Sequence, residues 1–338
     1  MTVKELAKMP FYFLSIFTWS KSFKNNPVIG SYIFNLLGLH VLRLVIAHFL
    51  FKFRLFLLAP LVSIEDRYNY QKNGFIIKHD FLPEEEFQNL KNELLGYHGN
   101  IREIIEGDTI SQKVSLNDST LLNLPMCRKF VEDKRLSKLM RYASSKNRFP
   151  NFYIENIKQH ALHINETDPQ KQMHSDTFHP TTKAWFFIDD VSDNNGPFMY
   201  VPGSNRLTWE RIKWEYAESL ISSLDKKSSS PDRYWDGSFR ISEGQLQKFS
   251  YAKPISFQVP PNTLLIANTH GFHCRGDAKS ESSRMSIWML ARDNPFNPFF
   301  SPFPNSTAKI FEYFWNIYIR KTNLTMEKSV KIGSFKDK

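Results

Sequence analysis

The second half of this 338-residue chain is built from short apolar segments separated by turn residues. The segments are residues 184–188, 198–201, 255–259, 263–267 and 285–289. Short apolar segments bounded by Pro, Gly or Asn are typical of β-strands. Because no long helical pattern lies between them, the order of segments argues against a parallel sheet with crossover helices and predicts an antiparallel sandwich or jelly roll.

The residues before this region add a strand and a helix to the same domain. Residues 73–77 read as a short strand, and a helix is expected to begin after Pro83, with three glutamates in its first turn, and to end at Gly96. This distribution of proline, acids and glycine is typical of helix ends. We predict a mainly β domain with flanking helices over residues 61–297, in which residues 208–250 form an inserted lid or side wall.

Cysteine content and charge exclude several classes of protein. Cys127 and Cys274 stand far apart, which excludes a disulfide framework and a thiolate-rich metal site. The formal net charge is +10, but residues 1–60 carry +6 of it and residues 307–338 carry +4, so the central body is neutral. A nucleic-acid-binding protein is expected to carry a basic face on its folded body, so we expect no nucleic-acid partner.

Residues 1–60 combine their positive charge with many apolar and aromatic residues. Arg43, Lys52 and Arg54 interrupt the apolar sequence before it reaches the roughly 18 to 20 residues of a membrane-spanning helix. Basic residues among Phe and Leu suit a helical segment that lies on a membrane surface, where Lys and Arg meet anionic lipid. The alternative is a helix packed on the protein core.

A second amphipathic helix is predicted within the C-terminal segment, residues 298–338, which ends in a basic tail. Its polar positions recur at helical spacing, and they are Lys309, Glu312, Asn316 and Arg320. We expect this helix to dock on the domain, although it could share one lipid-facing surface with residues 1–60.

The residues with the clearest chemical potential are His174 and Asp176, which form an H-x-D pair. On a strand this spacing places an imidazole and a carboxylate on the same side, as a metal site requires. A later histidine would complete a two-histidine, one-carboxylate face that leaves positions open for a co-substrate and dioxygen on iron(II). His270 and His273 are both candidates, and Arg284 is a candidate partner for a carboxylate co-substrate.

The sequence after the H-x-D pair resembles the phytanoyl-CoA dioxygenase family. Residues 188–206 read IDDVSDNNGPFMYVPGSNR, and members of that family carry a D-D-x-x-x-x-N-G-P turn followed by V-P-G-S-H-R. Asn205 replaces the histidine of the last motif, at a position that binds no metal in the family. The resemblance covers most of residues 65–295 and neither terminus.

This resemblance implies a double-stranded β-helix (jelly-roll or cupin-like) core that holds Fe(II) and 2-oxoglutarate and uses O2. It implies His174 and Asp176 as metal ligands, Arg284 as the partner of the distal carboxylate of 2-oxoglutarate, and Trp185 as a wall of the co-substrate pocket. The distal histidine ligand of the family stands eleven residues before the 2-oxoglutarate arginine. His273 stands at this distance from Arg284, so His273 is the expected third ligand.

Two neighbours of this ligand each have two alternative roles. His270 is expected beside the ligands or at a strand end. Arg275 is either a second positive group at the pocket or a solvated turn residue.

The expected function is therefore that of a 2-oxoglutarate-dependent non-haem iron dioxygenase that hydroxylates its substrate and releases succinate and CO2. Related halogenases lack the carboxylate ligand, so Asp176 favours hydroxylation. The basic, aromatic termini favour an amphiphilic, lipid-like or membrane-presented substrate and a cytoplasmic protein held peripherally on the anionic inner face of a membrane. The alternatives are a soluble small-molecule hydroxylase of the same family and a catalytically silent membrane-associated relative.

Overall fold

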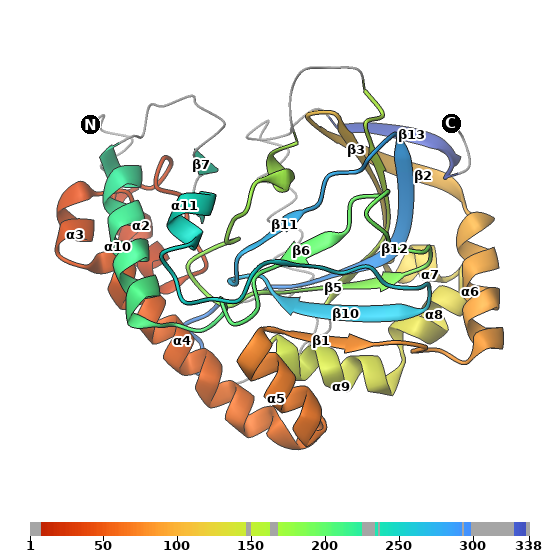
Figure 1. The fold of residues 1–338 in the computed structure, drawn as a ribbon, viewed down its shortest axis with the longest axis horizontal. Coiled ribbons are helices and arrows are strands. Elements are labelled where there is room, and N and C mark those ends of the chain that lie inside the picture. Colours follow the sequence, from red (N-terminus) through yellow and green to blue (C-terminus); the bar gives the residue numbers. More distant parts are fainter. Residues whose placement is uncertain are drawn as a thin grey trace.

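The computed structural model describes residues 8–146, 150–162, 168–224, 234–235, 237–292, 294–298 and 328–335. They form two antiparallel sheets with helices packed against the larger one (Figure 1). In spatial order the eight strands of the large sheet are β1 (Phe75–Lys78), β10 (Thr263–Asn268), β5 (Thr182–Phe187), β12 (Ser282–Ala291), β4 (Asn151–Gln159), β3 (Thr109–Ser115), β2 (His98–Glu106) and β13 (Lys328–Ser334).

The smaller sheet faces the large one and closes the jelly roll. Its strands are, in spatial order, β11 (His273–Arg275), β6 (Phe198–Tyr200) and β9 (Ile255–Ser256). A separate hairpin pairs β7 (Tyr234–Trp235) with β8 (Ser238–Phe239). The predicted mainly β architecture with a double-stranded β-helix core is confirmed.

Alternation along β5 shows how one strand serves two layers of the core. Phe186 packs with residues of the flanking helices, whereas Phe187 and Trp185 pack between the two sheets. Successive side chains of a strand point to opposite faces, so both faces of this strand are buried and its sequence is continuously apolar after Lys183. The face between the sheets is the one that leads to the candidate site.

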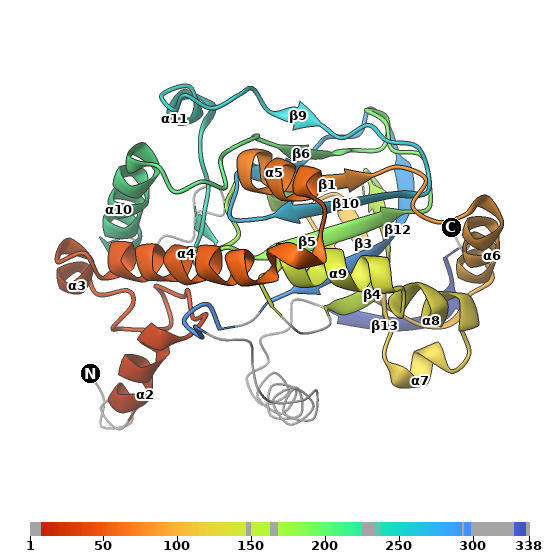
Figure 2. The ribbon, with the colours of Figure 1, turned by 90° about the horizontal axis from the view of Figure 1, so that it is seen from below.

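Helices cover the outer face of the large sheet (Figure 2). Six of them contribute to its core, and they are α4 (Leu39–Leu58), α5 (Ile64–Asn73), α6 (Glu84–Leu95), α7 (Asp118–Leu121), α8 (Pro125–Val131) and α9 (Lys134–Ala143). α6 has the predicted bounds, because it follows Pro83, carries acids in its first turn and stops at Gly96. The short α7 (Asp118–Leu121) precedes α8.

The N-terminal residues form a helical layer of their own at one end of the domain (Figure 1). Its elements are α2 (Met9–Leu14), η1 (Ser15–Phe17), α3 (Tyr32–Leu36), α4 (Leu39–Leu58) and η2 (Ala59–Leu61). By length and composition alone, one helix among the described residues could cross a membrane, Leu39–Leu61, of which 39% is buried in the protein. A core helix passes the same test, and Phe51, Leu55 and Leu58 belong to the main core.

Within residues 208–250 the predicted insertion contains α10 (Trp209–Leu224) and α11 (Glu243–Leu246). α10 packs against α3 and α4 of the N-terminal layer. The remaining short helix, η3 (Pro169–Lys171), precedes the H-x-D pair.

Of the predicted C-terminal segment, residues 298–338, the structure describes only residue 298 and residues 328–335. The helix predicted around Lys309–Arg320 lies outside the described residues. The segment expected to be a basic tail instead contains strand β13, which pairs with β2 along its whole length from Lys328 to Ser334. This strand was not expected from the sequence, because strand pairing depends on a distant partner, which local charge does not reveal.

Candidate metal centre

Three predicted ligands lie close together in the structure. His174 follows η3, His273 begins β11, and Asp176 follows His174 by two residues. One ligand atom of each lies within 4.8 Å of the other two, and all three residues are buried. The Nε2 atoms of His174 and His273 lie 3.7 Å and 3.6 Å from Oδ1 of Asp176. Two nitrogens and one oxygen at this spacing form one side of a metal coordination shell.

Backbone pairing fixes this arrangement. His174 and His273 form an antiparallel bridge in which each backbone N–H donates to the carbonyl of the other at 2.9 Å. The backbone N–H of Asp176 donates to the carbonyl of Thr269, which follows β10. The three side chains are therefore positioned by backbone hydrogen bonds between segments that are distant in sequence, which gives a site better precision than a free loop.

Each imidazole is oriented by its second nitrogen. Nδ1 of His174 lies 2.7 Å from the carbonyl oxygen of Gln172, and Nδ1 of His273 lies 2.8 Å from that of Gly271. A carbonyl oxygen only accepts, so Nδ1 carries the proton and Nε2 presents a lone pair to the centre. Nε2 of His273 is buried with no hydrogen-bond partner among the described residues. A metal ion would satisfy that atom, so these residues fit the iron implied by the resemblance.

The electrostatics of the site favour the ionisation states that a metal needs. Burial holds the pKa of His174 well below its usual value, and the neighbouring His273 adds to this, so the imidazole is neutral at pH 7. Burial alone would raise the pKa of Asp176, but Lys183 and then His273 hold it well below the usual value. Neutral imidazoles and an ionised carboxylate are the forms that coordinate metal.

Lys183 is the residue of this site that the sequence reasoning missed. Its Nζ lies 3.0 Å from Oδ1 and 2.9 Å from Oδ2 of Asp176. A signal was available, because Lys183, Trp185 and Phe187 alternate along β5 and all three line the same cavity. A lysine on the apolar inner face of a strand is costly unless it has a buried anionic partner.

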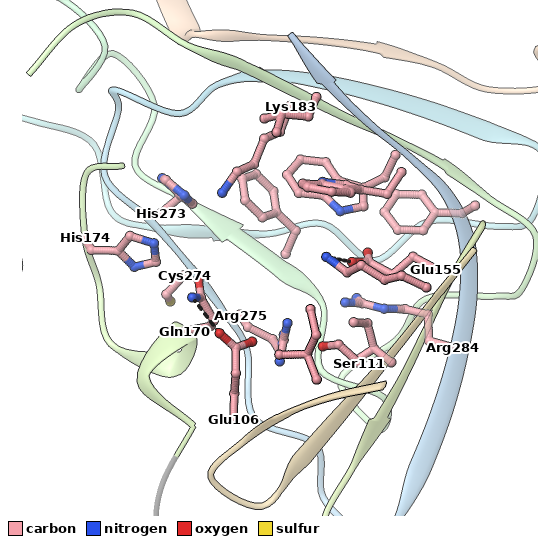
Figure 3. Close-up of a pocket in the computed structure, with 18 of the residues that line it drawn as sticks. Glu106, Ser111, Glu155, Gln170, His174, Lys183, His273, Cys274, Arg275 and Arg284 are labelled. Carbon is pink, nitrogen blue, oxygen red and sulfur yellow. Dashed lines mark hydrogen bonds and ion pairs between the residues drawn. The ribbon is translucent and has the colours of Figure 1, made fainter. Parts of the chain in front are cut away.

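A cavity of about 280 Å³ extends from His174 and His273 between the two sheets (Figure 3). Trp185, predicted as a wall of the co-substrate pocket, lines it and packs on Phe198 with ring centroids 4.5 Å apart. Arg284 lies across the cavity from the two histidines (Figure 3). Two of the three predicted ligands, His174 and His273, thus line the same cavity as Trp185 and Arg284.

Arg284 is held by the turn that carries the sequence resemblance. Its Nη1 donates to the carbonyl oxygen of Gly196 at 2.7 Å. Gly196 has φ of +66°, and a Cβ there would collide with the side-chain amide of Gln159, so only glycine fits. Burial lowers the pKa of Arg284 to about 10, and nearby Arg275 contributes, but the guanidinium stays charged at pH 7. A buried charged guanidinium is suited to a carboxylate ligand.

The structure also places the residues whose roles were open. Arg275 lines the cavity and forms an ion pair with the buried Asp168, so it is a positive group at the pocket and not a solvated turn residue. His270 is fully buried and does not line that cavity. Its Nδ1 lies 3.0 Å from the carbonyl oxygen of Thr177, beside the ligand Asp176. Cys274 lines the cavity as a thiol, because burial raises its pKa to about 12.

The chain was compared with protein families, with solved structures and with curated proteins. The family model for phytanoyl-CoA dioxygenase (PhyH) matches residues 70–241. Among solved structures the chain is similar to the epimerase SnoN in complex with Fe3+, alpha ketoglutarate and nogalamycin RO, at 17% identity over 69% of this chain and 83% of that chain, with a TM-score of 0.43. It is similar to HygX from Streptomyces hygroscopicus with nickel and 2-oxoglutarate bound, at 15% identity over 68% of this chain and 86% of that chain, with a TM-score of 0.42. No curated protein matches.

Proposed function

The chain belongs to the phytanoyl-CoA dioxygenase family of iron- and 2-oxoglutarate-dependent oxygenases, and from this premise we propose that it is a hydroxylase whose Fe(II) is bound by His174, Asp176 and His273. The observation that carries the proposal is the convergence of the buried residues His174, Asp176 and His273, whose ligand atoms all lie within 4.8 Å of one another. When bound, iron with 2-oxoglutarate and O2 supplies the oxidation in which a substrate C–H becomes C–OH while 2-oxoglutarate becomes succinate and CO2.

The residues of the cavity divide the remaining work. We assign Arg284 to the distal carboxylate of 2-oxoglutarate, because it lies across the cavity from the ligands and stays charged. Trp185 forms an apolar wall of the cavity and helps to exclude water from it. Lys183 keeps Asp176 ionised and oriented before the metal arrives.

The substrate class that we propose is amphiphilic or membrane-presented. Its support is twofold: the N-terminal layer exposes large apolar side chains, and the same layer contacts the segment that carries Asp176 through Lys21. A soluble small-molecule substrate is the alternative within the same enzyme class. A catalytically silent relative is disfavoured by the complete ligand set and Arg284.

Metal and co-substrate binding test this proposal directly. The purified protein is incubated without oxygen with Fe(II) and 2-oxoglutarate, and bound iron and 2-oxoglutarate are measured after gel filtration. We expect one iron per chain, with retention of 2-oxoglutarate that depends on the metal. Asp176→Ala is the matched variant, and iron retention equal to that of the unaltered protein would overturn the ligand assignment.

Substrate class is tested next, by succinate release on addition of O2. Membrane lipid extracts and water-soluble metabolite extracts are supplied in parallel arms. We expect succinate above the substrate-free background with the lipid fraction. Release only with the water-soluble fraction would select the soluble alternative, and iron binding with no release in either arm would favour the silent relative.

A further inference from the structure

Helix α4 is oriented with four of its five polar side chains toward the protein, and only Lys52 is exposed. His40, Arg43, His48 and Arg54 are all buried. Nε2 of His40 lies 2.8 Å from Oε2 of Glu215 on α10. Arg43 donates to the carbonyl oxygens of Ile16, Thr18 and Ser20, and Arg54 donates to that of Ser145. A helix on the surface of a water-soluble protein normally presents its charged residues to water. In α4 both arginines are instead buried against the protein.

The outward side of α4 is a continuous apolar stripe. Its exposed residues recur every three or four positions, and they include Leu42, Ile46, Phe49, Phe53, Phe56 and Leu57. Phe49 is 69% exposed and Phe56 is 76% exposed. Figure 2 shows α4 lying along one face of the domain with α2 and α3 beside it.

The neighbouring elements enlarge this apolar surface. Exposed apolar side chains of α2, η1 and the α3 region include Phe11, Leu14, Phe17, Ile33 and Leu37. Phe13 of α2 and Phe34 of α3 are in edge-to-face contact with centroids 6.2 Å apart, so these helices form one layer. We call this surface, made by α2, η1, α3 and the outward side of α4, the N-terminal apolar face. A patch of this kind marks an interaction site.

The charge around this face indicates what it meets. Three exposed lysines belong to this layer, and they are Lys8 at the start of α2, Lys24 between η1 and α3, and Lys52 on α4. No acidic residue occurs between Glu5 and Glu65 in the sequence. Apolar and aromatic side chains with lysines and no acids match the headgroup boundary of an anionic bilayer, where the rings enter the acyl region and the lysines meet phosphate.

We propose that the N-terminal apolar face docks this enzyme on an anionic membrane surface, with α4 lying in the plane of the interface. Spanning is excluded by the buried side of the helix, because Arg43 and Arg54 would lose the partners that compensate their burial. Only the purpose of docking rests on the proposed function, because that purpose is to bring an amphiphilic substrate to the metal site. Binding of this face to a membrane does not require turnover.

The N-terminal layer that carries this face contacts the candidate site through its buried side. Nζ of Lys21 donates to the carbonyl oxygen of Asp176 at 2.7 Å. The rings of His48 on α4 and His270 have centroids 4.4 Å apart, and the guanidinium of Arg43 lies 4.1 Å from the ring centroid of Phe178. The layer that would contact lipid therefore also supports the segment 176–178 that contains a ligand.

The test uses a dye that reports water exposure, attached to single cysteines in the full chain. Both native cysteines, Cys127 and Cys274, are buried, so an introduced exposed cysteine reacts selectively. Phe49→Cys and Phe56→Cys place the dye on the face, and Leu122→Cys, at a residue 72% exposed near α7, is the matched control. Vesicles of phosphatidylcholine alone are compared with vesicles that also contain phosphatidylserine.

We expect the dyes at positions 49 and 56 to lose contact with water when anionic vesicles are added, with a smaller response to neutral vesicles and none at position 122. High salt should weaken the response without removing it, because screening acts on the lysines and not on the buried rings. Phe49→Glu combined with Phe56→Glu should abolish co-sedimentation with vesicles while iron binding is unchanged.

Three results would overturn the proposal. The first is that the dyes do not respond to vesicles. The second is that the dye is already shielded from water in the free protein at all dilutions, which would mean that another part of the chain covers the face. The third is that shielding appears as the protein concentration rises, which would mean that a second copy of the chain covers it. Loss of iron binding in the unaltered protein would instead contradict the proposed function and leave docking standing, so the two failures are distinguishable.

Discussion

The backbones of His174 and His273 donate hydrogen bonds to each other's carbonyl oxygens, both at 2.9 Å, and this pairing sets their imidazole rings with centroids 4.5 Å apart. Residues ninety-nine positions apart in the sequence are thereby held at a fixed separation before any ligand binds. The candidate metal centre is thus a product of strand pairing, and it is expected to be preformed in the metal-free protein.

The two sides of α4 should differ sharply in their effect on stability. Phe51 is buried in the main core, whereas Phe49 is exposed on the same helix. Phe51→Ala should lower the free energy of unfolding by about 3 to 5 kcal/mol, since it removes core packing. Phe49→Ala should change it by no more than about 0.5 kcal/mol. Urea unfolding of the two variants checks this, and equal effects would contradict the orientation of α4.

The buried ion pair on α10 should make stability depend on pH. Burial would raise the pKa of Glu215, but Arg211 and then His40 hold it below its usual value. The stabilisation is therefore present above the usual glutamate pKa of about 4.5 and is lost as the pH falls through the lower folded-state value.

Arg211→Met should lower the free energy of unfolding at pH 7 by about 3 to 5 kcal/mol, because a buried carboxylate loses its cation. This deficit should shrink as the pH falls below the usual glutamate value. Arg135→Met removes an exposed pair with Asp133 and is the control, with an effect of about 1 kcal/mol or less. Urea unfolding across pH measures both, and a deficit that stays constant down to acid pH would refute this role of Glu215.

Much of this arrangement could be predicted from local sequence. The H-x-D pair and the N-G-P turn could be found because each pattern depends on neighbours in sequence. The structure brings the ligand atoms of His174 and Asp176 together and places the carbonyl oxygen of Gly196 on Arg284. The orientation of α4 could not be decided, because a polar stripe of His40, Arg43 and Arg54 fits water, lipid phosphate or a buried partner equally well. Its actual partners, such as Glu215 and Ser145, are distant in sequence.

Strand pairing across long sequence distances was equally hidden. The hairpin of β2 and β3 and the addition of β13 to its edge were not anticipated, since these segments lack a continuous apolar pattern. Lys183 was overlooked for a different reason: its charge was not read together with the alternation of Trp185 and Phe187 on the same strand.

Replacement of Arg284 should affect co-substrate binding more than metal binding. Lysine keeps the charge but cannot make the planar, two-pronged contact to a carboxylate. Arg284→Lys should raise the 2-oxoglutarate concentration required for half-maximal succinate release by roughly ten- to a hundredfold, as expected for charged hydrogen bonds worth about 1.5 to 3 kcal/mol. The iron requirement should stay nearly constant. An unchanged 2-oxoglutarate requirement would move the role to Arg275 or another cation of the cavity.

Iron binding by single-ligand variants tests the metal centre most directly. Fe(II) is added anaerobically to the unaltered protein and to His174→Ala, Asp176→Ala, His273→Ala and His270→Ala, and bound metal is measured after gel filtration, with folding checked by circular dichroism. We expect one iron per chain in the unaltered protein and in His270→Ala, and loss of tight binding in the other three. Retention of iron by His273→Ala together with its loss from His270→Ala would contradict the assignment and make His270 the distal ligand.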